Sequence, residues 1–397
     1  MNKIINEANG KLQVLALKAG AVTIPLFIAA IYLSTSLSSI LSGLLGVLWL
    51  LAGQYKTLSK IVKNNLVASS SLLLFCFFIV GLSYSSVSNA DAFSMLLKYI
   101  ELIFVLLLTV FLSTERSRYW AWNAFILSSA LILVISYLMH FGVLDLNHQG
   151  APAFKSRITH SIFISFFGFF CAHKAYDGIA YQKLYWLLLI VCAYNLFFIV
   201  EGRTGQLIAV ALVLLFAVQR FTKRGILLAV FIVGLLMLLF LNYSDKAARF
   251  NEGVVNIQSD LKPGPEQSQT SMGQRYMFWR YSLELIAEKP LFGHGTGSFA
   301  KEYERIASTE TMMAKNPHNE FLMVSVQLGV VGLLIYLGFL ASQYFLSKKL
   351  ADQEKYVAQG LLLTLIITSL FNTPIMDHAE GHWFLMMIAL CLSLIHI

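Results

Sequence analysis

The sequence has little charge for its length. Only 13% of its 397 residues are charged, against roughly 25% in a soluble domain, while 57% are hydrophobic and the mean hydropathy is +0.70. Such a chain has too little polar surface to cover a water-facing globule. The net charge is +8, but the basic residues are spread over short segments between apolar runs. The single basic patch of a nucleic-acid-binding protein is therefore missing, and no nucleic-acid partner is expected.

Cysteine is also scarce, and its spacing argues against two classes of site. None of the four cysteines belongs to a CxxC pair, so the sequence predicts neither a thiolate zinc site nor a disulfide framework. All of them lie in or beside apolar runs, where cysteine acts as a small packing residue. They are Cys76, Cys171, Cys192 and Cys391.

Long apolar runs dominate the rest of the chain. Runs of roughly 17–25 residues can cross a hydrocarbon core of about 30 Å, and each must be helical because lipid offers no partner for free backbone groups. We therefore predict an all-α membrane protein, a polytopic bundle of about twelve transmembrane helices. They are expected near residues 19–34, 37–53, 66–82, 95–112, 120–140, 158–173, 184–200, 205–219, 225–242, 317–346, 356–372 and 381–396. A second apolar run follows the first at once, so the first is expected to be retained and not cleaved as a signal.

The lysine and arginine bias of the short loops predicts the orientation. With the N-terminus in the cytoplasm, most loop cations fall inside, and an even number of spans returns the C-terminus to the cytoplasm. The outside loops are poor in cations, with Lys155, Arg157 and Arg203 as exceptions. The expected cytoplasmic cations are Lys56, Lys60, Lys63, Arg116, Arg118, Lys174, Lys183, Arg220, Lys223, Arg224, Lys348, Lys349 and Lys355.

A long polar segment, residues 243–316, interrupts the apolar pattern and is placed outside. It divides the chain into spans one to nine (1–242), this loop, and spans ten to twelve (317–397). Residues 259–271 are rich in Pro, Gly, Ser and Gln and are expected to be mobile. Apolar residues then recur at steps of four and three, which predicts an amphipathic helix that lies on the bilayer or caps the bundle. They are Met272, Tyr276, Trp279, Leu283 and Ile286.

Arginines stand at two outside positions. Arg203, in EGRTGQ (201–206), sits at the mouth of a predicted span, where an arginine usually has a partner or a role. Arg275 and Arg280 lie on the loop helix, outside its apolar stripe. Because a planar guanidinium matches phosphate oxygens, converging arginines can hold a diphosphate. The alternatives are an interfacial anchor paired with Glu201 and adhesion to anionic lipid heads.

A histidine motif follows, in NPHNEFL (316–322). Pro317 is expected to open a helix, with His318 and Asn319 in its first turn. A helix N-terminus disfavours a protonated imidazole, and a neutral histidine can serve as a general base. The alternative is an interfacial histidine with no chemistry.

Three further groups complete the candidates. GHGTGSF (293–299) follows no strand, so we predict a tight loop with a structural His294 and no dinucleotide site. Lys155, Arg157 and His160 enter the sixth span from outside. The last outside loop holds Asp377, His378, Glu380 and His382. These four are interpreted as neighbours in sequence and not as an i, i+4 pair on a helix with a third ligand, so no metal site is predicted.

The order of these motifs resembles the O-antigen ligase and polymerase superfamily. The resemblance rests on EGRTGQ, GQRYMFWRYSLELIAEKPLFGHGTGSF and PHNEFLMVSVQLGVVG, over about residues 195–340. The ligase branch is most similar, because His318-Asn319 is followed by a spacer from Glu320 to Leu328 and then by Gly-Val-Val-Gly (329–332). This resemblance implies a GT-C-like arrangement with a large, partly helical periplasmic loop.

The resemblance also implies an activity. A polysaccharide would pass from undecaprenyl pyrophosphate to a sugar hydroxyl of the lipid A-core, outside the inner membrane of a Gram-negative bacterium, without nucleotide, metal or other cofactor. His318 would take the hydroxyl proton while Arg203 and Arg275 stabilise the leaving diphosphate, with inversion if the displacement is single. Substrate contacts are expected from Arg280, Asn319, Lys155, Arg157, His160, Asp377 and His378.

Other functions stay open at this stage. An O-antigen polymerase would use the same donor with a second lipid-linked glycan as acceptor, and a protein O-oligosaccharyltransferase shares the histidine motif. A flippase or transporter would need polar residues deep inside several spans; Glu101 and Asn195 are such residues, although most middle spans are apolar. A structural scaffold would need none of these side chains.

Overall fold

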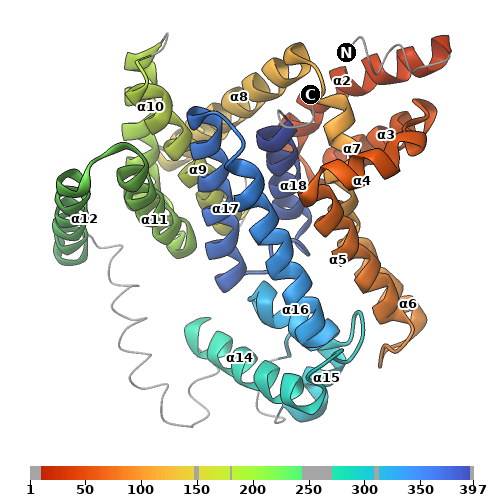
Figure 1. Ribbon diagram of the computed structural model, residues 1–397. Coiled ribbons are helices and arrows are strands. Elements are labelled where there is room, and N and C mark those ends of the chain that lie inside the picture. The colour runs from red at the N-terminus through yellow and green to blue at the C-terminus, as the bar shows by residue number, and fades with distance from the viewer. Residues whose placement is uncertain (1–9, 147–151, 179–180, 244–270, 308–312, 394–397) are drawn as a thin grey trace.

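The structure, a computed structural model, describes residues 10–146, 152–178, 181–243, 271–307 and 313–393. Throughout these ranges the chain is helical, with short turns between the helices and no strand (Figure 1). The mobility predicted for residues 259–271 falls almost wholly outside the described residues.

The first half of the chain builds one side of the bundle. Its helices are α2 (Lys11–Leu33), α3 (Thr35–Leu51), α4 (Leu58–Asn64), α5 (Leu66–Leu82), α6 (Asn89–Lys98), α7 (Phe104–Phe111) and α8 (Glu115–His140). The short helices η1 (Gln54–Thr57) and η2 (Ile100–Ile103) lie among them.

The later helices are α9 (Arg157–Tyr176), α10 (Gln182–Tyr194), η3 (Asn195–Ile199), α11 (Arg203–Arg220), α12 (Lys223–Tyr243), α14 (Ser271–Glu288), α15 (Phe299–Ile306), α16 (Glu320–Ser347), α17 (Asp352–Phe371) and α18 (His378–Leu392).

The helix lengths confirm a polytopic membrane protein. In the described part of the chain, six helices are long and apolar enough to cross a membrane, and up to eight spans result if two bent pairs are each counted as one. The bends are 111° between α4 and α5 and 45° between α6 and the η2–α7 segment. Each of the twelve predicted ranges overlaps a helix, but α3, α9, α12 and α18 fall outside this count. The number twelve stays a prediction.

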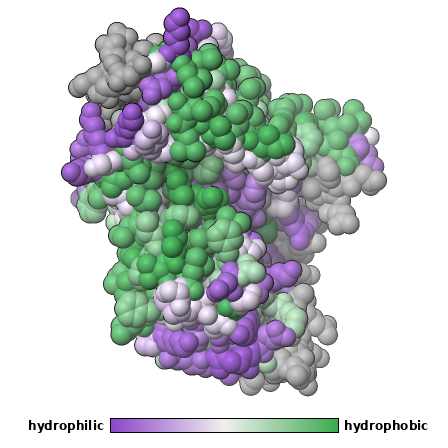
Figure 2. All heavy atoms as spheres, turned by 90° about the vertical axis from the view of Figure 1, so that its right-hand side faces the viewer, coloured by the Kyte–Doolittle hydropathy of each residue, from purple (hydrophilic) through white to green (hydrophobic). Residues whose placement is uncertain are grey.

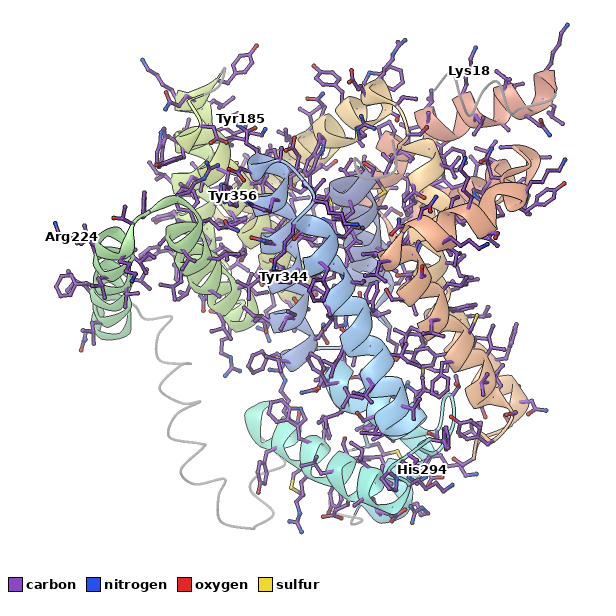
Figure 3. The ribbon with its side chains drawn as sticks, viewed as in Figure 1. Lys18, Tyr185, Arg224, His294, Tyr344 and Tyr356 are labelled. Atoms are coloured by element: carbon purple, nitrogen blue, oxygen red, sulfur yellow. The ribbon has the colours of Figure 1, made fainter. Side chains whose placement is uncertain are left out.

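The two ends of the bundle differ. Helices α14 and α15 lie together at one end, next to the start of α16 (Figure 1). On the face shown in Figure 2, hydrophilic side chains gather at that end and also at the opposite one, and apolar side chains cover most of the middle. Figure 3 shows Lys18 at the opposite end from His294. The loop helices and Lys18 are thus separated along the bundle.

Helix α18 forms the centre of the core. Every residue from Ala379 to Leu392 is buried. The Trp383 indole N–H donates a hydrogen bond to the hydroxyl of Tyr32 (2.8 Å), and its ring stacks on Phe163 with centroids 4.7 Å apart. Because Trp383 meets partners from α2 and α9, this contact holds the early and middle helices around the last one.

A break in α16 determines where the polar end attaches. At Gly329 the backbone leaves the helical region, with φ 65° and ψ −164°, which frees carbonyl groups before the break. The GHGTGSF loop satisfies them, because the amides of His294 and Gly295 donate to the carbonyls of Val326 (2.9 Å) and Gln327 (2.8 Å). The amide of Val330 donates in turn to Pro290 (2.8 Å). The predicted tight loop is confirmed, and the Gly-Val-Val-Gly segment is the kink that this loop covers.

We expect Gly329→Ala to destabilise the protein. A positive φ costs a non-glycine residue about 1–2 kcal/mol, and a methyl group here would also overlap the backbone of Leu291. Gly338→Ala is the matched control, because it lies in the same helix and a methyl group there meets nothing within 4 Å. Thermal unfolding in detergent should show a lower Tm for Gly329→Ala and an unchanged or higher Tm for Gly338→Ala. Equal Tm values for the two variants would show that the kink does not require glycine at position 329.

Candidate functional site

His318 lies just before α16, and the predicted helix start is wrong by three residues. The helix begins at Glu320 with Asn319 as its N-cap, whose side-chain oxygen accepts from the amide of Leu322 (3.0 Å). His318 has φ 49°, a left-handed conformation that is uncommon for histidine. Its amide donates to the side chain of Asn316 (2.9 Å). The helix starts after Asn319 and not at Pro317, because an asparagine side chain is a favoured N-cap. Asn319 therefore has a structural role.

A hydrogen-bond chain orients the His318 ring. The side-chain amide of Asn372 donates from Nδ2 to Oε2 of Glu380 (2.8 Å), so its Oδ1 turns toward Nδ1 of His318, 3.4 Å away. Thr159 donates to the other oxygen of Glu380 (3.0 Å). Because Oδ1 can only accept, Nδ1 of His318 carries the proton and Nε2 keeps its lone pair. At 3.4 Å the bond is long, as such contacts often are without substrate.

Helix α14 packs on His318 with a face that matches the predicted stripe only in part, since Trp279 and Ile286 of that stripe pack against the core. The helix itself is confirmed, but its buried side chains are Phe278, Ser282 and Leu285. Tyr276 and Leu283, assigned to the packed stripe, are 44% and 59% exposed. The packed face is therefore rotated relative to the predicted stripe and shares Trp279 and Ile286 with it. Arg275 is consequently near the packed side, contrary to the prediction that it lies away from it.

Two aromatic residues join α14 to the histidine motif. The Trp279 indole N–H donates to the carbonyl of Pro317 (3.0 Å). The Phe278 ring stacks on His318, with centroids 6.2 Å apart and planes at 27°. These contacts place Arg275, one turn earlier on the same helix, beside the imidazole.

The charges of Arg203, Arg275 and His318 are coupled. Burial lowers the pKa of His318 below its usual value, the Arg275 cation lowers it further, and the bond to Asn372 partly opposes both. Burial likewise lowers the pKa of Arg275, and the charge of Arg203 adds to this effect. Arg203 is the first residue of α11 and is half-buried. Arg275 is therefore within electrostatic reach of both His318 and Arg203.

The other predicted contacts are distributed unevenly. Arg280 is exposed and forms an i, i+4 ion pair with Glu284 (3.2 Å). Arg157 is exposed at the start of α9, with its carbonyl against Gly202. His160 is buried inside the bundle, where its Nε2 meets Oδ1 of Asn195 (3.1 Å). Neither Arg280 nor His160 lines the cavity that contains His318.

That cavity has a volume of about 950 Å³ and is lined by α3, the α6–η2–α7 segment, the residues before α16, the turn between α17 and α18, and the start of α18. Polar side chains line much of it: Ser39, Lys98, Glu101, Asn316, His318, Asn372, Asp377, His378 and His382. A second cavity of about 460 Å³ shares Asp377 and His378 and adds Lys155. Burial lowers the pKa of Lys155, and the Asp377 carboxylate partly opposes this. The predicted residues His318, Asp377 and His378 thus line one cavity, and Lys155 lines the second cavity that shares two of them.

Sequence reasoning missed Asn372 and misassigned Glu101. Asn372 ends α17 in FNTP, and no periodicity or motif distinguished it from an ordinary helix-terminal asparagine. Glu101 was noticed only as a polar residue inside a span, which suggested a transport path. In the structure it lines the same cavity as His318.

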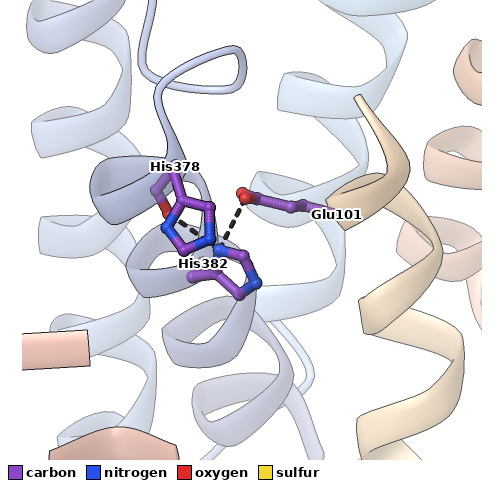
Figure 4. A group of neighbouring side chains, drawn as sticks. All are labelled: Glu101, His378 and His382. Carbon is purple, nitrogen blue, oxygen red and sulfur yellow. Dashed lines mark hydrogen bonds and ion pairs between the residues drawn. The ribbon is translucent and has the colours of Figure 1, made fainter. Parts of the chain in front are cut away.

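The interpretation of His378 and His382 is also corrected. They are an i, i+4 pair on α18, and Glu101 from η2 supplies a third potential ligand (Figure 4). The sequence interpretation failed because the start of α18 was placed at residue 381, which left His378 in a loop. The Asp377 side chain caps α18, accepting from the amides of Ala379 (3.0 Å) and Glu380 (3.1 Å), and so includes His378 in its first turn.

The fold and the site define a polytopic helical membrane protein with a basic, histidine-containing group at one end. Residues 187–337, which include Arg203, Arg275 and His318, match the Wzy_C family, described as O-Antigen ligase. The resemblance inferred from the motifs is confirmed for this segment. The family is one of polysaccharide ligation, whose substrates are lipid-linked polysaccharides in general.

Two curated proteins are also similar to parts of the chain. An uncharacterized protein of Haemophilus influenzae is 28% identical over 141 residues, which cover 34% of this chain and 35% of that protein. A putative polysaccharide ligase of Rickettsia conorii is 28% identical over 87 residues, 20% of this chain and 21% of that protein. The similarity therefore spans about a third of the first relative and a fifth of the second.

We expect Arg275→Gln to raise the pKa of His318 toward its ordinary value, because a neighbouring cation no longer opposes protonation. Burial remains, so the pKa should stay below that of an exposed histidine. Arg280→Gln is the matched control from the same helix, since its guanidinium is exposed and paired with Glu284. Carbon NMR titration of histidine-labelled protein measures the pKa of His318 in each variant. An unshifted His318 in Arg275→Gln would show that the two charges are not coupled.

Proposed function

We propose that this protein is an O-antigen ligase. It transfers polysaccharide from undecaprenyl pyrophosphate to the lipid A-core of a Gram-negative bacterium. The observation that carries this proposal is a neutral, oriented His318 that lines a large, partly polar cavity and is within electrostatic reach of Arg275, which is in turn within reach of Arg203. A match to the O-antigen ligase family over the same residues supports it.

The proposed topology places this group in the periplasm. The bundle has twelve spans in a GT-C-like arrangement, with α3, α9, α12 and α18 added to the helices that qualify by length. Both termini are cytoplasmic, and α14 and α15 belong to a periplasmic loop of the inner-membrane protein. The separation of Lys18 from His294 along the bundle (Figure 3) supports this orientation under the positive-inside rule.

The proposed reaction is a direct displacement at an anomeric carbon. Nε2 of His318 removes the proton of the acceptor hydroxyl as its oxygen attacks, and the bond from the anomeric carbon to the pyrophosphate oxygen breaks. The electron pair leaves with the diphosphate, whose growing negative charge is stabilised by Arg275 and Arg203. A single displacement of this kind inverts the anomeric centre. Asn372 and Glu380 act as positioning residues, because they hold His318 in the tautomer that can accept a proton.

A lipid-linked donor needs an apolar place for its chain. An apolar cavity of about 590 Å³ lies between α9, α10 and α11, lined by residues such as Leu189, Phe197 and Val213. Helix α11 begins at Arg203, so the helix that forms one wall of this apolar cavity also has a cation as its first residue. This arrangement supports a substrate with an acyl or polyprenyl tail and an anionic head.

Transport receives less support from the described residues. Asn195 is satisfied inside the bundle, since it meets His160 and donates to Ser136 (2.9 Å). Glu101 faces the cavity that contains His318 and not a separate path. An O-antigen polymerase and a protein O-oligosaccharyltransferase would use the same donor chemistry, so the acceptor must be identified by experiment.

A deletion strain complemented with His318→Ala should make bare lipid A-core while lipid-linked polymer accumulates. The physical reason is that the variant lacks the proposed base, whose charge is coupled to that of Arg275. A lipopolysaccharide gel and a lipid extract measure both products, and His140→Ala, an exposed histidine on α8, is the control. Lipid A-core capped with single units would identify a polymerase instead. Normal capping with missing protein glycans would identify the oligosaccharyltransferase.

In a purified assay with labelled donor, His318→Ala should lower kcat by about 10²–10⁴-fold, the usual contribution of a general base. Arg275→Ala should lower it by about 10²–10³-fold, the usual effect of removing one donor to a developing anion. Arg280→Ala should change it little, because that side chain is exposed and already paired. Turnover by Arg275→Ala at the wild-type rate would remove Arg275 from the mechanism.

A further inference from the structure

Three potential metal ligands meet at the wall of the His318 cavity. His378 and His382 come from successive turns of α18, and Glu101 comes from η2 (Figure 4). One donor atom from each residue lies within 4.8 Å of the donor atoms of the other two. The two imidazole rings are 4.3 Å apart between centroids. Residues distant in sequence therefore present two nitrogens and a carboxylate to one point.

Burial makes this cluster costly without a ligand. Glu101 and His382 are 4% and 6% exposed. Nδ1 of His382 lies 2.5 Å from Oε1 of Glu101 and 2.7 Å from the carbonyl of His378. Among the described residues, Oε2 of Glu101, Nδ1 of His378 and Nε2 of His382 are buried without a hydrogen-bond partner. Buried polar atoms without a partner are rare in folded proteins, so one such atom on each of these three residues calls for an explanation.

The backbone is shaped to allow this approach. Position 381, between the two histidines, is glycine, and a methyl group there would overlap Oε2 of Glu101. The ring of His382 is held between Phe27 and Phe104, with centroids 5.5 and 5.6 Å away. Ser39 contacts Nε2 of His378 at 2.7 Å. Packing thus restrains the ring of His382, and the contact with Ser39 restrains that of His378, as an outer hydrogen bond usually does for a metal ligand.

We propose that Glu101, His378 and His382 form a binding site for one divalent transition-metal ion, Zn²⁺ in particular. Zinc binds nitrogen at about 2.1 Å, so tetrahedral ligands stand about 3.4 Å apart, which is closer than the 4.8 Å within which these donor atoms lie. Two imidazoles and one carboxylate suit zinc, whereas magnesium and calcium prefer oxygen ligands alone. The ion replaces the proton that His382 shares with Glu101, since a ligating imidazole must release it.

Charges around the cluster act in opposite directions. The Asp377 carboxylate acts on Glu101 and His378 and favours a bound cation, while the Lys155 ammonium acts on both histidines and opposes it. Three protein ligands leave a fourth position, and because all three residues line the cavity, that position faces it. It can hold water or an anionic oxygen atom. The site is independent of the ligase proposal, because binding of the ion needs no glycan substrate.

The test is metal binding by the full chain in lipid nanodiscs. After treatment with a chelator, Zn²⁺ is added, excess ion is removed, and bound zinc is measured by mass spectrometry. The wild type should retain about one ion per chain, as expected for a single site, and excess Mg²⁺ should not displace it. Glu101→Gln and His382→Gln should bind at least about tenfold more weakly, since even outer-shell changes cost 10–100-fold. His140→Gln, which removes an exposed histidine elsewhere, should bind as the wild type does.

Two further measurements separate loss of the site from loss of the fold. Zn²⁺ should raise the Tm of the wild type but not of His382→Gln, and Co²⁺ should give the wild type the visible absorption of a nitrogen-ligated ion, which Zn²⁺ then removes. His318→Ala should keep the metal while losing transfer, so the two proposals can fail separately. A wild type that retains no zinc, or one whose affinity equals that of both ligand variants, would overturn the proposed site.

Discussion

The break in α16 at Gly329 is the constraint on which the polar end of the molecule depends. In a membrane, a backbone carbonyl released from a helix must find a partner within the protein. The GHGTGSF loop supplies that partner through its amides, and this ties the segment carrying α14 and α15 to the bundle. Once attached, α14 lays Phe278 and Trp279 against the residues that precede α16. A backbone requirement inside one helix therefore positions an arginine beside a histidine at its end.

The electrostatics of the candidate site follow from this packing. A histidine surrounded by solvent would be partly charged near neutral pH, but burial and Arg275 both favour its neutral form. The same arginines that make His318 a usable base are suited to an anionic leaving group. Asn372 determines which ring nitrogen of His318 carries the proton. Glu380 accepts from the amide nitrogen of Asn372, so the amide oxygen of Asn372 faces the ring. Charge, burial and tautomer thus agree on one role for His318.

The cavity brings together residues with different origins in the chain. Its walls come from α3, the bent α6–η2–α7 segment, the residues before α16, and the turn between α17 and α18. Glu101 reaches it because the span is bent at η2, and Gly381 leaves room for its carboxylate. Bends and small residues, which weaken a simple transmembrane helix, are here what allows polar groups to meet.

The sequence by itself determined the features that depend on neighbours in the chain. Apolar length predicted the helices, glycine spacing predicted the tight loop, and the motif around His318 identified the family, because each signal is contained in a short stretch. Only the tertiary structure decided which face of α14 is packed, that Asn372 and Glu380 orient His318, and that Glu101 joins His378 and His382. Those outcomes depend on how helices distant in sequence rotate and bend against one another, and no local periodicity encodes the rotation of one helix relative to another.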